Sequence, residues 1–175
     1  MNDEAGGHRR MGLVMQALAW LVFMALVGFY FSDLLEQQYN PNQTVETRRI
    51  KGGAREVVLK RSKNGHYLST GAINGQEVVF MLDTGATGIA IPADVAQRLS
   101  LKPGRRLATQ TANGIAVAYA TKLDRVSVGD IALDDVFASI SPGLKTDEVL
   151  LGMSFLRHIE FTQRGDTLIL RQYPE

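Results

Sequence analysis

The chain has 175 residues, a formal net charge of +1, 45% hydrophobic residues and no cysteine. That length accommodates about one domain of ordinary size with an appendage. The absence of cysteine excludes disulfide bonds, thiol nucleophiles and thiolate metal sites. The near-neutral charge balance does not indicate nucleic-acid binding. We therefore expect no nucleic-acid partner, and no metal or cofactor is predicted.

An apolar segment over residues 11–31 is the first element of the chain. It reads MGLVMQALAWLVFMALVGFYF and carries no charged residue. As a helix it would cover about 30 Å, which is the thickness of the hydrocarbon core of a bilayer. A cleaved signal peptide usually has a shorter apolar core that ends at a small-residue cleavage site. The segment is therefore interpreted as a retained transmembrane helix.

The charges that flank this segment predict its orientation. His8, Arg9 and Arg10 precede it, whereas residues 32–47 contain neither Lys nor Arg. Positive charge stays on the cytoplasmic side, so residues 1–10 are expected to form a cytoplasmic tail and the rest of the chain to lie outside the cytoplasm. A basic stretch over residues 48–63 argues weakly for the opposite orientation.

The remainder divides into a linker and a strand-rich domain. Residues 32–55 are polar or basic and show no hydrophobic period, which is typical of a linker, and residues 56–175 are predicted to fold. Strands are expected over residues 56–60, 66–73, 76–82, 88–92, 108–112, 115–120, 123–128, 131–140, 149–152, 159–161 and 167–170. A short helix over residues 93–99 follows Pro92. Short strands separated by turn signals predict an all-β barrel or sandwich.

A candidate catalytic carboxylate lies at the end of the predicted strand 76–82. Asp83 follows that apolar run and is followed by Thr84 and Gly85. Burying an unpaired carboxylate there costs several kcal/mol unless hydrogen bonds or a proton compensate, and Gly85 permits close backbone approach. Such a carboxylate suits attack of water on an amide by two carboxyls that share one proton. The motif occurs once and the chain has no internal repeat, so the second carboxyl must come from another copy.

Residues 80–87, Phe-Met-Leu-Asp-Thr-Gly-Ala-Thr, resemble the catalytic loop of the retropepsin-like (clan AA) aspartic proteases. Residues 65–170 are similar to the bacterial, membrane-anchored branch of that group. Residues 149–156, Val-Leu-Leu-Gly-Met-Ser-Phe-Leu, resemble the family's second element, a strand that packs beneath the loop and leads into a short helix. The resemblance implies a retropepsin-like closed β-barrel or sandwich with one or two short helices, behind a single transmembrane helix.

The resemblance also implies roles for individual residues. Asp83 would be catalytic, Thr84 would hydrogen-bond across a dimer axis, and Gly85 would line the substrate cleft. The active-site loop would comprise Thr84, Gly85, Ala86 and Thr87, and the supporting strand Leu150, Leu151 and Gly152. The hairpin over residues 108–116 falls where the family carries a substrate-covering flap, with Thr111, Ala112, Asn113 and Gly114 as candidates. After Gly152 the retroviral enzymes carry an Arg-Asp or Arg-Asn pair that helps to hold the dimer, whereas this chain carries Met153 and Ser154.

Two functions are compatible with these features. The first is an aspartic endopeptidase of a bacterial inner membrane, with a periplasmic catalytic domain, a homodimeric site, and a peptide or protein as substrate. The alternative is a non-catalytic dimeric β module that binds extended peptide or braces a membrane complex. A phosphate loop like those of actin-like ATPases is disfavoured, since those folds need alternating helices and strands and about twice the length.

Overall fold

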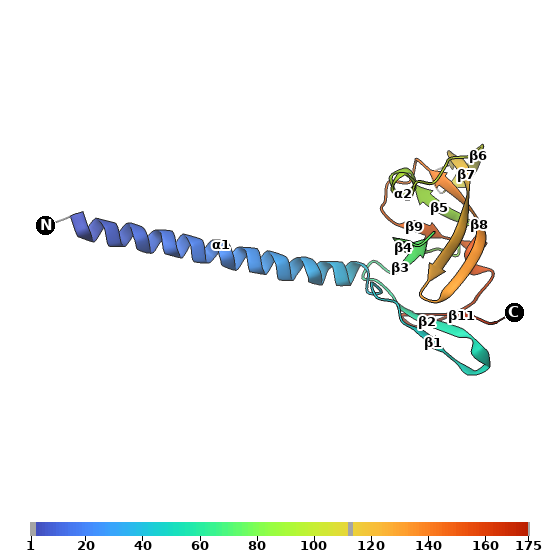
Figure 1. Ribbon diagram of the computed structural model, residues 1–175, viewed down its shortest axis with the longest axis horizontal. Helices are drawn as coiled ribbons and strands as arrows, with labels where there is room; N and C mark the ends of the chain where they lie inside the picture. The colour runs from blue at the N-terminus through green and yellow to red at the C-terminus, as the bar shows by residue number, and fades with distance from the viewer. Residues whose placement is uncertain (1–2, 112–113, 175) are drawn as a thin grey trace. The chain divides into compact units, whose positions relative to one another are not determined.

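The structure, a computed structural model, describes residues 3–111 and 114–174. The chain forms two compact units, Met1–Gln38 and Tyr39–Glu175. The described part of the first unit consists of helix α1 (Asp3–Tyr39), and the other helices and strands belong to the second unit (Figure 1). Met11–Tyr39 is long and apolar enough to cross a membrane, and its 18-residue apolar window has a mean hydropathy of 2.1. A signal sequence would meet the same criterion.

Helix α1 extends beyond the predicted apolar segment. It continues past Phe31 to Tyr39, so residues 32–39 of the expected linker are helical. These residues include leucine, glutamate and glutamine, which favour helix, and contain neither glycine nor proline. Pro41 disfavours the helical conformation for the residue that precedes it. The helix therefore ends where the sequence first opposes it.

The second unit consists mainly of strands, with short helices between them. The strands are β1 (Thr47–Arg49), β2 (Arg55–Lys60), β3 (Tyr67–Ile73), β4 (Gln76–Leu82), β5 (Ile89–Pro92), β6 (Arg106–Thr111), β7 (Gly114–Val128), β8 (Ile131–Ser141), β9 (Val149–Leu151), β10 (Glu160–Arg164) and β11 (Thr167–Gln172). The helices are the 3₁₀ turn η1 (Lys51–Gly53), α2 (Ala93–Arg98) and α3 (Met153–Leu156). The expected all-β class with few helices is confirmed. The two runs expected over residues 115–120 and 123–128 form one continuous strand, β7.

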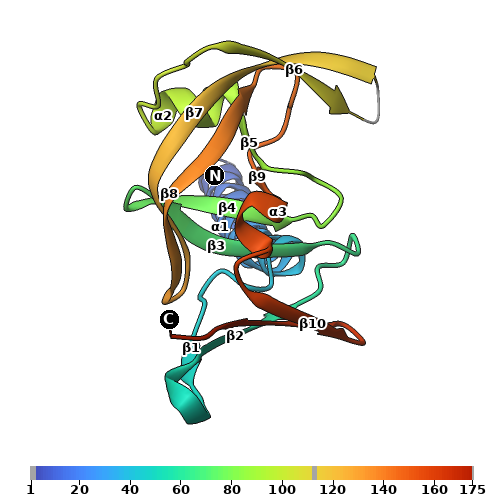
Figure 2. The same cartoon turned by 90° about the vertical axis from the view of Figure 1, so that its right-hand side faces the viewer.

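The larger sheet closes on itself. Its strand order is β3-β4-β9-β5-β8-β7-β6, and β3 also pairs with β7 through Ala72–Ser127 and Ile73–Val126. This pairing leaves β6 outside the ring (Figure 2). Closure covers edges that an open sheet would expose, although β5 pairs with β8 only over residues 138–141 of β8. The barrel encloses an apolar core whose largest fully buried side chains include Phe80, Phe155 and Leu123.

A tight turn sets the register of the strand that leads to the candidate site. Asn74 and Gly75 connect β3 to β4 and have φ angles of 51° and 80°. Positive φ at both central residues is the requirement of a type I′ hairpin turn, which Asn-Gly favours. The turn pairs Ile73 with Gln76, and the same register continues to Tyr67 and Leu82. It thereby fixes where β4 ends, directly before Asp83.

The smaller sheet, in the order β1-β2-β11-β10, contains a cluster of charged and polar side chains. Arg171 donates from Nε to Glu56 Oε2 over 2.7 Å and from Nη1 to Glu160 Oε1 over 3.1 Å. The Tyr173 hydroxyl donates to Glu160 Oε2 over 2.8 Å. The cluster joins β2, β10 and the end of β11 across the sheet. The hydrogen bond to Glu56, opposed in part by desolvation, raises the pKa of Arg171.

The hydrogen bond to Glu160 makes the contribution of Tyr173 to stability dependent on pH. That bond, with smaller effects of desolvation and of the Glu160 charge, raises the pKa of Tyr173 above its ordinary value. A raised folded-state pKa adds stability that is complete below the ordinary value and is lost as the pH rises through the raised one. At neutral pH the wild-type protein should therefore unfold at a higher urea concentration than Tyr173→Phe. This difference between the two urea midpoints should disappear in strongly alkaline solution. Coincident midpoints at neutral pH would contradict this.

Residues 40–49 of the expected linker belong to the folded unit. Asn42 is 6% exposed. Its Nδ2 donates to the carbonyl oxygens of Lys60 (2.8 Å) and Leu68 (2.6 Å), and its Oδ1 accepts from the Lys60 N–H (2.8 Å). Thr70 N–H donates to the Asn42 carbonyl over 3.1 Å. These bonds, together with β1, fasten the segment after α1 to the domain, so it is not a free tether.

Replacing Asn42 should destabilise the domain. Asn42→Ala leaves the buried carbonyl of Leu68 and the partly buried carbonyl and N–H of Lys60 without their partner, and an unsatisfied buried group costs about 1–3 kcal/mol. We expect the free energy of unfolding to fall by at least about 2 kcal/mol, measured as a lower urea midpoint. Gln43→Ala, at an exposed neighbouring position, is the matched control. Equal midpoints for the two variants would refute the role of Asn42.

Candidate active site

Both ends of the loop that carries Asp83 are attached to one strand. β4 runs parallel to β9 and pairs Leu82 with Leu151, whereas β5 runs antiparallel to β9 and pairs Ala90 with Leu150. β9 thus lies between the strand that enters the loop over residues 83–88 and the strand that leaves it. This arrangement holds the loop in a fixed position relative to the barrel.

Hydrogen bonds within the loop orient the carboxylate. The Asp83 N–H donates to the Leu151 carbonyl over 3.2 Å, and the Ala86 N–H donates to the Asp83 carbonyl over 3.2 Å. The Gly85 N–H donates to Asp83 Oδ1 over 2.8 Å. Asp83 is half-buried, while Thr84 and Gly85 are exposed. The carboxylate is therefore held by its own loop and remains accessible at the surface of the chain.

Gly152 lets the end of β9 pass close beneath the loop. A Cβ atom at this position would meet the carbonyl oxygens of Ala86 and Gly88. The next residue, Met153, donates its N–H to the Ala86 carbonyl over 2.8 Å. Only a residue without a side chain permits both the close approach and this hydrogen bond. Gly152 thus sets the position of the loop from below.

Ser154 is a supporting residue that the sequence did not single out. Its Oγ accepts a hydrogen bond from the Ile89 N–H over 3.1 Å, immediately after the loop. Ser154 stands in α3, where the retroviral enzymes are expected to carry the second residue of their dimer-holding pair. The sequence did contain one indication of this role. A backbone N–H at the end of the loop needs an acceptor, and the hydroxyl of the residue two positions after Gly152 could provide it.

The described flap candidates, Thr111 and Gly114, lie at the end of the hairpin formed by β6 and β7. Thr111 pairs with Gly114 at its end, and Ala112 and Asn113 lie outside the described residues. Ile115 is 78% exposed, so the described end of the hairpin presents an apolar side chain to solvent. β6 pairs only with β7 among the described strands. The structure thus brings the predicted loop residues together with the predicted supporting strand: Asp83, Thr84, Gly85, Ala86 and Thr87 lie beside Leu150, Leu151 and Gly152. In the part of the chain that the structure describes, neither β6 nor the end of β7 at Gly114 pairs directly with β4, β5 or β9.

Comparisons with known proteins agree with the barrel and the loop. A sequence model described as "gag-polyprotein putative aspartyl protease" matches residues 69–158. The crystal structure of a retropepsin-like aspartic protease from Rickettsia conorii superposes with a TM-score of 0.57 at 27% identity, covering 74% of this chain and 96% of that one. The closed barrel and the Asp-Thr-Gly loop above β9 thus belong to a protein of the retropepsin-like class. The chain belongs to this family of aspartyl proteases.

Two curated relatives are similar to the chain over most of its length. "Uncharacterized protein in cobV 5'region" of Sinorhizobium sp is 37% identical over 123 residues, which cover 68% of this chain and 53% of the relative. "Uncharacterized protein RP867" of Rickettsia prowazekii (strain Madrid E) is 29% identical over 164 residues, which cover 90% of this chain and 69% of the relative. The chain thus spans about half the length of the first relative and about two thirds of the second.

Proposed function

We propose that the chain is an aspartic endopeptidase whose site is completed by a second copy of itself. The observation that carries this proposal is the loop at Asp83, which is accessible, oriented by the Gly85 N–H and attached at both ends to β9. Hydrolysis of a peptide bond by carboxylates needs two of them, and the described domain has one such loop. A two-fold axis beside Asp83 supplies the second, and two-fold dimers are the commonest oligomers.

The two carboxyls have different tasks in this mechanism. When they lie about 3 Å apart they cannot both ionise, so the pair holds one proton. The ionised carboxylate takes a proton from the attacking water, and the protonated one donates a hydrogen bond to the scissile carbonyl. Thr84 and Gly85 flank each carboxyl at the exposed side of the loop. Their role is to position substrate and partner subunit, while the β6–β7 hairpin covers the bound peptide.

The apolar helix gives the proposed enzyme its place in the cell. Met11–Tyr39 is long enough to act as an anchor. His8, Arg9 and Arg10 lie on its N-terminal side, and positive charge favours the cytoplasm. We propose a single-pass protein of a bacterial inner membrane with its protease domain in the periplasm. Confinement of the anchors to one membrane raises the effective concentration of the chains and favours pairing.

Cleavage of a peptide library tests the proposed activity. The full chain, purified in neutral detergent, should hydrolyse a mixed peptide library at acidic to neutral pH, and mass spectrometry would identify the cleaved bonds. Asp83→Asn should leave the library intact, whereas Asp147→Asn, at an exposed site outside the loop, should cleave like wild type. An intact library with the wild-type chain, combined with retention of peptides on it, would instead identify a peptide-binding module without catalysis.

A further inference from the structure

A cavity of about 720 Å³ lies beside β8, and no residue of the loop over residues 83–88 lines it. Its lining includes residues 132–137 of β8 without interruption, together with α3 residue Ser154, Arg157 and the C-terminal Tyr173. Side chains alternate between the two faces of a regular strand, so consecutive residues line one cavity where it runs along the strand's edge or where the strand is distorted, and β8 is distorted at Asp135, which has a φ of 59°. We call this cavity the β8 groove.

The backbone of β8 has a free hydrogen-bonding edge in the groove. On the neighbouring strand β7, Arg125 turns its backbone toward Asn74, whose Oδ1 accepts from the Arg125 N–H (3.0 Å) and whose N–H donates to the Arg125 carbonyl (2.8 Å). Arg125 pairs with Asp134. In an antiparallel pair of this kind the backbone groups of both residues point away from each other. The N–H and carbonyl of Asp134 therefore point into the groove, and no described residue bonds them.

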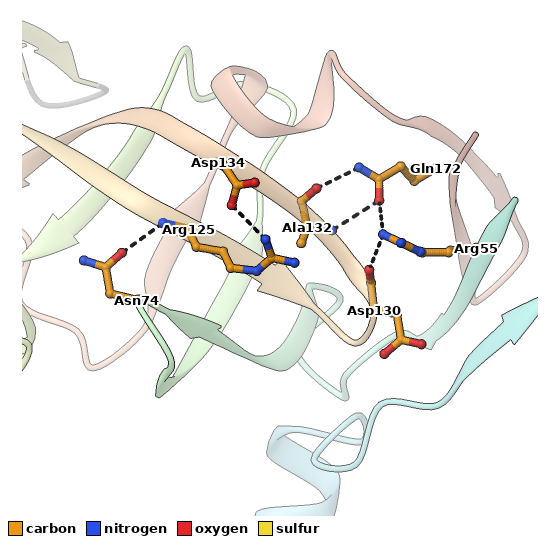
Figure 3. Close-up of polar contacts among 7 residues, drawn as sticks. All are labelled: Arg55, Asn74, Arg125, Asp130, Ala132, Asp134 and Gln172. Carbon is orange, nitrogen blue, oxygen red and sulfur yellow. Dashed lines mark hydrogen bonds and ion pairs between the residues drawn. The ribbon is translucent and has the colours of Figure 1, made fainter. Parts of the chain in front are cut away.

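Other parts of the chain already bond the edge of β8 on both sides of Asp134. Figure 3 shows the Gln172 side-chain amide acting as a strand substitute at Ala132, where Oε1 accepts from the N–H (3.3 Å) and Nε2 donates to the carbonyl (2.7 Å). Beyond Asp134 in the other direction, β5 begins to pair with β8 at Ala138. A short length of edge thus remains open between a side-chain cap and a true strand. Asp135, with a φ of 59°, interrupts the extended conformation of this edge, so the N–H and carbonyl of Asp134 are the groups placed to pair with a short extended peptide.

The charges in the groove favour an acidic ligand. Its two carboxylates are already paired, Asp134 with Arg125 over 2.8 Å and Asp135 with Lys122 over 2.6 Å. Arg157, in contrast, has no acidic partner among the described residues; its Nε donates to His158 Nε2 over 3.2 Å. The groove therefore offers an uncompensated guanidinium, which binds carboxylates well.

Arg55 and two aromatic side chains complete the walls of the groove. Arg55 Nη1 donates to the Asp130 carbonyl over 3.0 Å and to Gln172 Oε1 over 3.3 Å (Figure 3), and the described residues provide it with no carboxylate. Phe137 is 52% exposed and Tyr173 54% exposed. Exposed rings beside an open strand edge provide apolar contact for the alternate side chains of an added strand.

We propose that the β8 groove binds an extended acidic segment of another protein by strand addition to β8. The segment's backbone pairs with Asp134, its carboxylates face Arg157 and Arg55, and its apolar side chains contact Phe137 and Tyr173. The groove is independent of the proposed catalysis, but it is physically connected to the loop. Ser154 lines the groove and also accepts the hydrogen bond of Ile89 at the end of the active-site loop.

Peptide binding to an Asp83→Asn chain tests the groove without the complication of cleavage. The probe is a fluorescein-labelled, acetylated hexapeptide of alternating Glu and Val, added to the full chain in neutral detergent. We expect saturable anisotropy that weakens with added salt, because surface ion pairs are screened. Arg157→Glu should weaken binding at least about tenfold. Arg164→Glu makes the same charge change at an exposed position of β10 outside the groove, and should leave the affinity unchanged.

Two further measurements distinguish strand addition from other modes of binding. The same peptide with methylated backbone nitrogens should not bind, and a Lys-Val hexapeptide should not bind. Hydrogen exchange should slow at residues 132–137 when the Glu-Val peptide is present. The proposal is overturned by the absence of saturable binding, by equal effects of Arg157→Glu and Arg164→Glu, by equal binding of the methylated peptide, or by protection that appears at residues 83–88 instead. None of these outcomes depends on whether the wild-type chain cleaves peptides.

Discussion

An equal mixture of wild-type and Asp83→Asn chains should hydrolyse peptide at about one quarter of the rate of the same total amount of wild type, because random pairing gives only about one quarter fully wild-type dimers. Asp83→Asn alone should be slower than wild type by about 10³-fold or more, since its dimer has neither carboxyl and can neither activate water nor donate a proton to the carbonyl. The measurement is the initial rate on a peptide found in the library, after the chains have exchanged in detergent.

A matched mixture identifies the source of the loss. Wild type mixed with Asp147→Asn should keep the full rate, because Asp147 is exposed and lies outside the loop. A rate of one half in the Asp83→Asn mixture would mean that each chain acts alone. That outcome would reject the shared site while leaving the family membership unaffected.

Gly152→Ala should disable the loop. The added Cβ would meet the carbonyl oxygens of Ala86 and Gly88, which are backbone atoms and move only if the loop moves. Overpacking of this kind costs about 1–3 kcal/mol of unfolding free energy. A displacement of about 1 Å at catalytic groups can lower the rate by about 10²-fold. We expect both losses, measured as the urea midpoint and as the peptidase rate under conditions where the variant remains folded.

The control for this prediction is Gly143→Ala. No heavy atom lies within 4 Å of a Cβ built at Gly143, and its φ is not in the left-handed region. This variant should retain the wild-type midpoint and rate. If Gly152→Ala behaved in the same way, β9 would not set the position of the loop.

The central features of the fold and the candidate site could be predicted because their signals are local. The apolar run before Asp83 indicates a strand that ends there. The glycine after Thr84 and the sequence Leu151-Gly152 each indicate a close approach of backbone segments. The closed barrel is also consistent with strands of regular spacing and Asn-Gly turns. These features depend on neighbouring residues, so one sequence is enough to reveal them.

The folded part of the segment after α1, residues 40–49, could not be predicted because its signals are not hydrophobic. The side chains of β1 are partly or fully exposed at the edge of the small sheet, so no apolar alternation marks it. Asn42 is buried through hydrogen bonds to Lys60 and Leu68, which lie 18 and 26 residues further along the chain. A polar residue buried by distant backbone looks like a loop residue in the sequence.

The β8 groove could not be predicted for a related reason. Arg55, Asp134, Arg157 and Gln172 meet only after the barrel has closed and β11 has joined the small sheet. The bond from Gln172 to Ala132 spans 40 residues, and neither residue type is unusual where it stands. Such a site is defined by tertiary structure alone.

The position of β11 has a consequence for the order of events during synthesis. It lies between β2 and β10, so β2, which is synthesised early in the domain, receives its inner neighbour from a strand that is synthesised after all the other described strands. Until Thr167–Gln172 has emerged, Arg55–Lys60 exposes one row of its backbone groups. A nascent chain halted before Thr167 would display two unjoined edges, which chaperones recognise as incomplete folding. The smaller sheet can therefore form in full only after β11 has been synthesised.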